Sequence, residues 1–163
     1  HRGLGIATWF AMAATLTMGA LTYADSYGST DYEETRCAQG NPILGQANCN
    51  VPYMHIFPVL ATTALYGSTF GYSVRMEREA DEGQRDRRTS NRRLRMHRTL
   101  RWVHFALMAV QIVEGLIFAN LDNMGLDERD DHEVLFGLNT FHLGIGVATF
   151  GVLTWAGALM LSD

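Results

Sequence analysis

Histidines are the residues of this sequence best suited to carry chemistry. The stretch RMHRTLRWVHF places His97 and His104 seven residues apart, where a cluster of arginines gives way to an apolar run. Three more histidines, His1, His55 and His142, lie at the ends of other apolar runs or inside them. A neutral imidazole is a common metal ligand and an axial ligand of haem iron. Whether the five act as ligands depends on the elements that position them.

Four apolar runs are each long enough to cross a bilayer as a helix. They cover residues 3–22, 53–74, 100–120 and 134–161, and about 20 predominantly apolar residues suffice for one span. The runs are apolar all round, as expected of helices surrounded by lipid and by one another. The sequence therefore predicts an all-α integral membrane protein, an up-down-up-down four-helix bundle that forms one domain over residues 1–163.

The charged residues predict the orientation of this bundle. Residues 75–101 hold ten of the thirteen arginines, whereas segments 23–52 and 121–133 are acidic and hold one arginine each. The positive-inside rule places the Arg-rich loop 75–99 on the cytoplasmic or stromal side and both acidic loops on the opposite side. Beside a membrane, these arginines are better suited to anionic lipid or an acidic protein surface than to nucleic acid.

The two cysteines, Cys37 and Cys49, lie in the first acidic loop. A disulfide between them would place this loop in an oxidising compartment. Two free thiols fit the same spacing, and the sequence leaves both interpretations open.

The predicted topology sorts the five histidines into two layers. His1, His97 and His104 lie at the Arg-rich face, on the first and third spans, whereas His55 and His142 lie toward the acidic face, on the second and fourth. In such a bundle these spans form the two diagonal pairs, so each layer can hold one tetrapyrrole between opposite helices. His104 lies deeper than His97 and is the stronger ligand candidate, while His97 suits a propionate or phosphate at the interface. The alternative for every ring is a hydrogen bond to a neighbouring carbonyl or threonine.

Two further polar residues, Glu114 and Gln111, lie inside the third span. An ionised carboxylate in the bilayer is unfavourable unless it is paired or close to water. We expect Glu114 to be protonated, bonded to Gln111, or used as a proton-carrying or metal-ligand group. The sixth histidine, His132, lies in the acidic segment DERDDHEV and is expected to be solvated.

The segments RMHRTLRWVHF and FHLGIGVATFG resemble the four-helix transmembrane b-type cytochromes, the superfamily of ascorbate-reducible cytochromes and ferric-reductase-like domains. More loosely, the chain is similar to a branch of four-helix proteins from cyanobacteria and plastids. The superfamily resemblance implies two haems, one held by His1 with His97 or His104, the other by His55 with His142. The second resemblance implies a thylakoid location, with the cysteine-containing loop on the lumenal side.

Two functions follow. One is a small accessory subunit of a photosynthetic-membrane complex, such as a photosystem. It would bind chlorophyll, haem b or both, with carotenoid and lipid, and dock on a larger membrane-protein complex. The other is a two-haem b-type cytochrome that carries electrons across the membrane. We favour the first on sequence grounds, because it does not require His1 inside the bilayer and because no ascorbate or nicotinamide motif is recognisable. The chain also lacks a catalytic triad, phosphate-binding loop or CxxC motif, so it is not expected to act as a soluble-type enzyme.

Overall fold

The computed structural model describes residues 2–83 and 92–161, and all regular structure within these ranges is helical. Long helices are formed by α1 (Arg2–Ser26), α3 (Tyr53–Gly83), α4 (Arg92–Phe118) and α5 (His132–Leu161), and short ones by α2 (Gln46–Asn50) and the 3-10 turns η1 (Tyr32–Glu34) and η2 (Asp122–Met124). The predicted all-α class is thus confirmed. The helices extend beyond the predicted spans into the Arg-rich segment, because Arg, Glu and Ala are strong helix formers where hydropathy falls.

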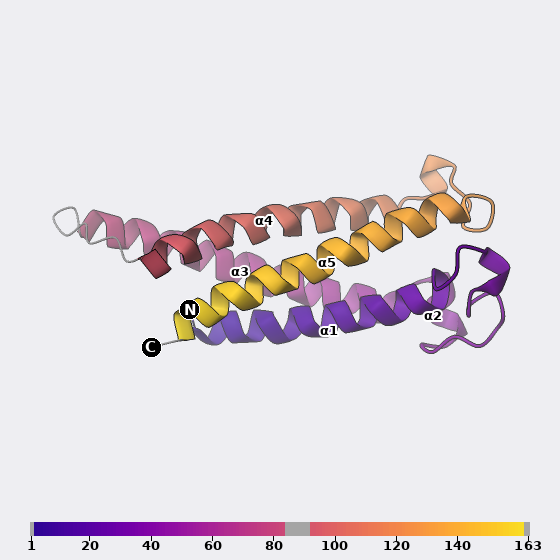
Figure 1. Ribbon diagram of the computed structural model, residues 1–163, viewed down its shortest axis with the longest axis horizontal. Helices are drawn as coiled ribbons and strands as arrows, with labels where there is room; N and C mark the ends of the chain where they lie inside the picture. Colours follow the sequence, from indigo (N-terminus) through magenta and orange to yellow (C-terminus); the bar gives the residue numbers. More distant parts are fainter. Residues whose placement is uncertain (1, 84–91, 162–163) are drawn as a thin grey trace.

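The four long helices lie side by side along one axis (Figure 1). α1 packs against both α3 and α5, and α5 packs against α4. The start of α1, the end of α5 and the two ends of α3 and α4 that follow one another in sequence lie at one end of the molecule (Figure 1). α3 and α5 both pack against α1 and, within the described ranges, are not packed closely against each other.

The distribution of side chains is inverted relative to a soluble protein. Fully buried side chains include Thr8, Thr62 and Thr149, whereas large apolar side chains such as Phe57 (67% exposed) and Phe10 (63% exposed) point outward. Soluble proteins rarely expose large contiguous apolar surfaces. An outer surface of this kind suits a surrounding of lipid.

Among the described residues, three helical segments are long and apolar enough to cross a membrane: Gly3–Ser26, Arg95–Phe118 and His132–Leu159. They indicate a membrane protein. The predicted span 53–74 is helical as part of α3 but is not one of the three, because its threonine, serine, tyrosine and histidine residues lower its hydropathy.

The hydroxyl groups of α3 find partners inside the protein. Thr62 shares a hydrogen bond of 2.7 Å with Thr15 of α1, and Thr69 shares one of 2.8 Å with Thr8. Paired hydroxyls between helices are a recurrent way to satisfy polar groups away from water. Thr62 and Thr69 of α3 are therefore turned toward α1.

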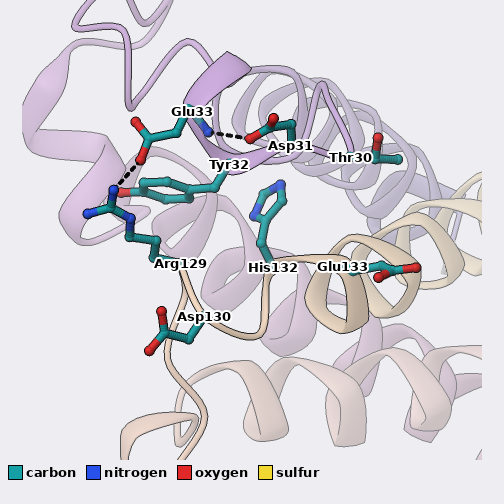
Figure 2. A pocket seen from close by; sticks show the side chains of 8 residues that line it. All are labelled: Thr30, Asp31, Tyr32, Glu33, Arg129, Asp130, His132 and Glu133. Carbon is teal, nitrogen blue, oxygen red and sulfur yellow. Dashed lines mark hydrogen bonds and ion pairs between the residues drawn. The ribbon is translucent and has the colours of Figure 1, made fainter.

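The prediction that His132 is solvated is wrong, because its side chain is only 4% exposed. Its ring stacks on Tyr27 with a centroid distance of 5.5 Å. It also meets Tyr32 edge-on at a centroid distance of 5.6 Å, and these two side chains, Tyr32 and His132, are drawn in Figure 2. The ring also lies 3.0 Å from the carbonyl oxygen of Ser29, measured at Nε2. The acidic neighbours in sequence predicted exposure, but the aromatic partners come from the loop after α1 and join the two acidic loops.

Tyr32 and His132 also line an open pocket of about 530 Å³ between the two acidic loops (Figure 2). Arg129 forms an ion pair with Glu33 across it and lies over the ring of Tyr32. Burial raises the pKa of the nearby Tyr27 phenol, and the negative charge of Glu128, which accepts its hydrogen bond, raises that pKa further.

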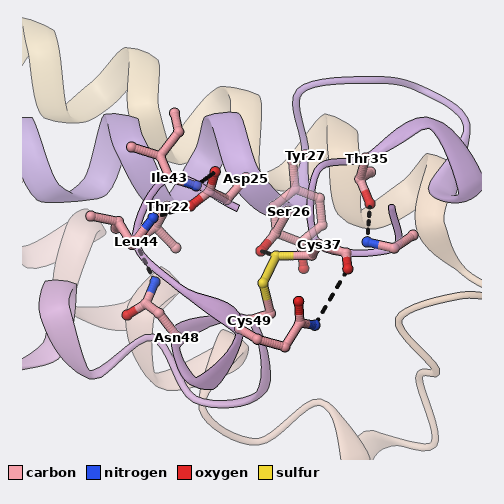
Figure 3. Close-up of a disulfide and its surroundings, with 12 residues drawn as sticks. Thr22, Asp25, Ser26, Tyr27, Thr35, Cys37, Ile43, Leu44, Asn48 and Cys49 are labelled. Carbon is pink, nitrogen blue, oxygen red and sulfur yellow. Dashed lines mark hydrogen bonds between the residues drawn. A yellow bond between two sulfur atoms is a disulfide. The ribbon is translucent and has the colours of Figure 1, made fainter. Parts of the chain in front are cut away.

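Cys37 and Cys49 form a disulfide in the loop between α1 and α3 (Figure 3). The loop is also fastened to α1 by Asp25, whose buried carboxylate accepts hydrogen bonds from the backbone N–H groups of Ile43 (2.7 Å) and Leu44 (2.9 Å). Asn48 accepts a hydrogen bond of 3.1 Å from the N–H of Met54, in the first turn of α3. These contacts fix the start of α3, beside His55.

Candidate functional site

Two of the predicted ligand residues meet inside the protein. His55 is in the first turn of α3, and His142 is in α5. Their ring centroids are 6.4 Å apart and their planes are inclined at 89°. The structure therefore brings together the histidine pair that was predicted for the acidic face.

The ring of His55 is held by α1. Its Nδ1 lies 3.2 Å from the carbonyl oxygen of Thr15, and because a carbonyl only accepts, Nδ1 carries the proton. The ring rests against Gly19, where an added Cβ would lie only 2.9 Å from His55 Cε1. A glycine at this position makes room for the imidazole.

The ring of His142 is held by α4. Its Nδ1 lies 3.2 Å from Glu114 Oε2. Gln111, one turn earlier, donates a hydrogen bond of 2.7 Å to the backbone carbonyl of His142 and lies 3.4 Å from Glu114 Oε2. A bond to Gln111 was one of the roles expected for Glu114 and is present at 3.4 Å, while the shorter contact of Glu114, at 3.2 Å, is with the histidine.

In both rings Nδ1 is engaged, and Nε2 has no hydrogen-bond partner within residues 2–83 and 92–161. This is the arrangement of metal-binding histidines, which donate the N–H of the other ring nitrogen to a carbonyl or carboxylate. The fixed tautomer leaves a lone pair on His55 Nε2. The pair can thus offer two imidazole nitrogens to one metal.

The described part of the chain contains no group of three or more His, Cys, Asp and Glu residues placed to hold a metal ion. A tetrapyrrole supplies four nitrogens to its metal, so one or two imidazoles would complete such a site. His55 and His142, whose ring centroids are 6.4 Å apart, are the residues that would hold it.

The second predicted layer is not assembled in the same way. His104 is buried, and its Nδ1 lies 2.7 Å from the hydroxyl of Tyr66 in α3. His97 Nδ1 lies 3.0 Å from the carbonyl oxygen of Ala156 in α5. The two rings are thus directed to different helices, and His1 lies outside the described residues. Ligation by His97, His104 and His1 stays a prediction.

A buried ionic group near the Arg-rich end was missed by the sequence reasoning. The guanidinium of Arg101 is almost fully buried, donates a hydrogen bond of 3.0 Å to the Ser73 hydroxyl and forms an ion pair with Glu77. Arg98 lies 3.1 Å from the same carboxylate. Counting arginines for orientation treated them all as solvated, although Glu77 amid the basic residues was a signal for pairing.

Comparisons of the chain with protein-family models, curated proteins and solved structures returned no significant match. The functional assignment therefore rests on the geometry of the site.

Proposed function

We propose that this protein is a membrane-embedded cytochrome that binds a haem b between His55 and His142 and carries electrons. The observation that carries the proposal is the meeting of these two imidazoles, whose ring centroids are 6.4 Å apart, from two helices that both pack against α1. Each has its Nδ1 anchored and its Nε2 available. A pair of histidines suits an electron-carrying haem b, because the protein would then supply both of the iron ligands that the macrocycle does not.

In this proposal all four long helices span the membrane as an up-down-up-down bundle. The polarity of α3 is tolerated because its threonines pair with those of α1 and its His55 lies against Thr15 and Gly19. The arginines then lie on the cytoplasmic or stromal side. The disulfide-bonded loop lies on the opposite side, where an oxidising compartment would preserve Cys37–Cys49.

The proposal departs from the function that the sequence favoured. A chlorophyll magnesium needs one axial imidazole, whereas the site presents two, which favours haem as the tetrapyrrole. The photosystem partner, the thylakoid location and the binding of chlorophyll or carotenoid stay predictions from the sequence. A second haem at the Arg-rich face, held through His104 or His97 with His1, also stays a prediction.

In this proposal, five residues around the site and the outer surfaces of the helices have distinct roles. His55 and His142 would hold the haem iron, and the bound haem would supply one-electron redox chemistry. Thr15 and Glu114 fix the orientations of the two rings, and Gly19 leaves space for one of them. The apolar outer surfaces of the helices keep the site within lipid and away from bulk water.

The test is to purify the protein in detergent and to measure its absorption spectrum and its pyridine haemochrome. We expect sharp, redox-sensitive α bands that are lost or strongly reduced in His55→Ala and in His142→Ala. Asn139→Ala is the matched control, because Asn139 is on α5 close to His142 and interacts with the Leu135 carbonyl of its own helix and with Tyr27 rather than with either imidazole. Chlorophyll absorption without iron, or full α bands in both histidine variants, would contradict the proposal.

A further inference from the structure

The two imidazoles of the proposed haem site have chemically different supports. His55 Nδ1 donates to the backbone carbonyl of Thr15, which is neutral. His142 Nδ1 instead faces the carboxylate of Glu114 at 3.2 Å. The two contacts are equal in length, at 3.2 Å, so the rings differ in the acceptor behind each, an amide carbonyl for His55 and a carboxyl oxygen for His142.

Glu114 is held where it can keep this contact. It is 14% exposed and His142 is 20% exposed, so neither side chain points to the surface. Gln111 connects the two helices at the same level, since its amide donates to the His142 carbonyl at 2.7 Å and lies 3.4 Å from Glu114 Oε2. A carboxylate inside an apolar span is costly, and the contact with the histidine gives it a partner.

We infer that Glu114 is a positioning residue that orients His142 and makes it the more electron-donating of the two axial ligands. The inference rests on the proposed function, because it assigns a role within the same haem site. A carboxylate behind a ligating histidine fixes the ring and raises its basicity. A more basic ligand favours the oxidised iron, and therefore Glu114 lowers the reduction potential of the haem.

Three variants separate charge from position. Glu114→Gln keeps an oxygen that can accept from His142 Nδ1 but removes the charge, so the ring stays oriented. Glu114→Leu removes both the charge and the acceptor. Asn139→Ala removes a polar side chain of α5 that is hydrogen-bonded to neither imidazole. Each is reconstituted in lipid nanodiscs with haem b, and its midpoint potential and haem retention are measured by spectroelectrochemistry and competition with apomyoglobin.

We expect Glu114→Gln to raise the equilibrium constant for haem reduction about tenfold, which is about 59 mV for a one-electron couple. Its haem retention should stay close to that of the wild type. Glu114→Leu should weaken haem binding by about tenfold or more, the effect typical of losing a group that orients a metal-ligating histidine. Asn139→Ala should change neither quantity. A wild-type potential in Glu114→Gln, or wild-type retention in Glu114→Leu, would overturn the inference.

A measurement without haem keeps this result distinct from failure of the proposed function. Nitrogen-15 NMR of the histidine rings in the haem-free protein should show the proton of His142 on Nδ1 in the wild type. The same signal should shift to a mixture of tautomers in Glu114→Leu. If the wild type takes up no haem, the proposed function fails, and the ring spectrum still decides the contact. An identical His142 tautomer in both proteins would overturn the positioning role.

Discussion

The imidazole planes of His55 and His142 are nearly perpendicular, at 89°, with their centroids 6.4 Å apart. Each orientation is set by a different neighbouring helix, α1 for His55 and α4 for His142. The angle between the two ring planes therefore depends on how α1 and α4 are placed, and a substitution that shifts Thr15 or Glu114 should change it.

This angle predicts the electron paramagnetic resonance spectrum of the oxidised, haem-loaded protein. Low-spin ferric haem with perpendicular axial imidazoles gives a strongly anisotropic signal with a large highest g value, whereas parallel planes give a rhombic set of three lines. We expect the anisotropic type for the His55–His142 haem. A high-spin spectrum, or only a rhombic one, would show that the two rings do not bind the iron with the orientations seen here.

Substitution of Gly19 should disturb haem binding through His55 alone. An alanine Cβ at Gly19 would lie 2.9 Å from His55 Cε1 and 3.1 Å from its Nδ1, so the ring must shift from the position in which Nδ1 contacts the Thr15 carbonyl. We expect Gly19→Ala to weaken haem binding by about tenfold, comparable to the loss of a hydrogen bond that orients a metal-ligating histidine. The measurement is haem retention after transfer competition with apomyoglobin.

Gly5→Ala is the matched control on the same helix, because a Cβ there meets nothing within 4 Å. Alanine also has the higher helix propensity, so this variant should keep its haem and be no less stable. Equal retention in Gly19→Ala and Gly5→Ala would mean that the close approach of α1 to His55 does not matter for binding.

The sequence predicted more of the fold than of the site. The lengths of the apolar runs located the helices, because the hydropathy of a lipid-facing residue can be read from its type alone. The proximity of His55 and His142 was predicted from their similar depth in helices that run alternately up and down. The partners of those rings were not predictable in this way. Thr15 contributes a backbone carbonyl, which no side chain reveals, and Glu114 has several possible partners on its own helix and on α5. The burial of His132 depends on Tyr27 and Tyr32, which are about 100 residues away in the sequence, and hydropathy does not predict contacts between such distant segments.

Alkaline pH should destabilise the contact between the two acidic loops through Tyr27. The folded protein raises the pKa of this phenol through burial and the charge of Glu128. Because the folded pKa is above that of the unfolded chain, the contribution to stability is complete below the ordinary pKa of about 10. It is lost as the pH rises from there through the folded pKa.

We therefore expect Tyr27 to ionise at higher pH than the exposed tyrosines when phenolate absorbance is followed, and we expect the contact between the loops to weaken as it does so. Tyr27→Phe should reduce the amplitude of the late-ionising step by one tyrosine. Tyr72→Phe, which replaces an exposed tyrosine of α3, is the control and should leave that amplitude unchanged. An unchanged late amplitude in Tyr27→Phe would contradict the assignment.

The threonine pair between α1 and α3 should stabilise the bundle in lipid. Thr62 is almost fully buried and shares its hydrogen bond of 2.7 Å with Thr15. Interhelical hydrogen bonds in membrane proteins contribute about 0.6 kcal/mol on average, so we expect a coupling energy of this size between the two hydroxyls. The measurement is a double-mutant cycle of Thr15→Val and Thr62→Val in reversible unfolding in mixed micelles.

Thr17→Val is the control, because its hydroxyl bonds only to the Ala13 carbonyl of its own helix. A coupling between Thr15 and Thr62 no larger than that between Thr17 and Thr62 would show that α3 is not held to α1 by these hydroxyls.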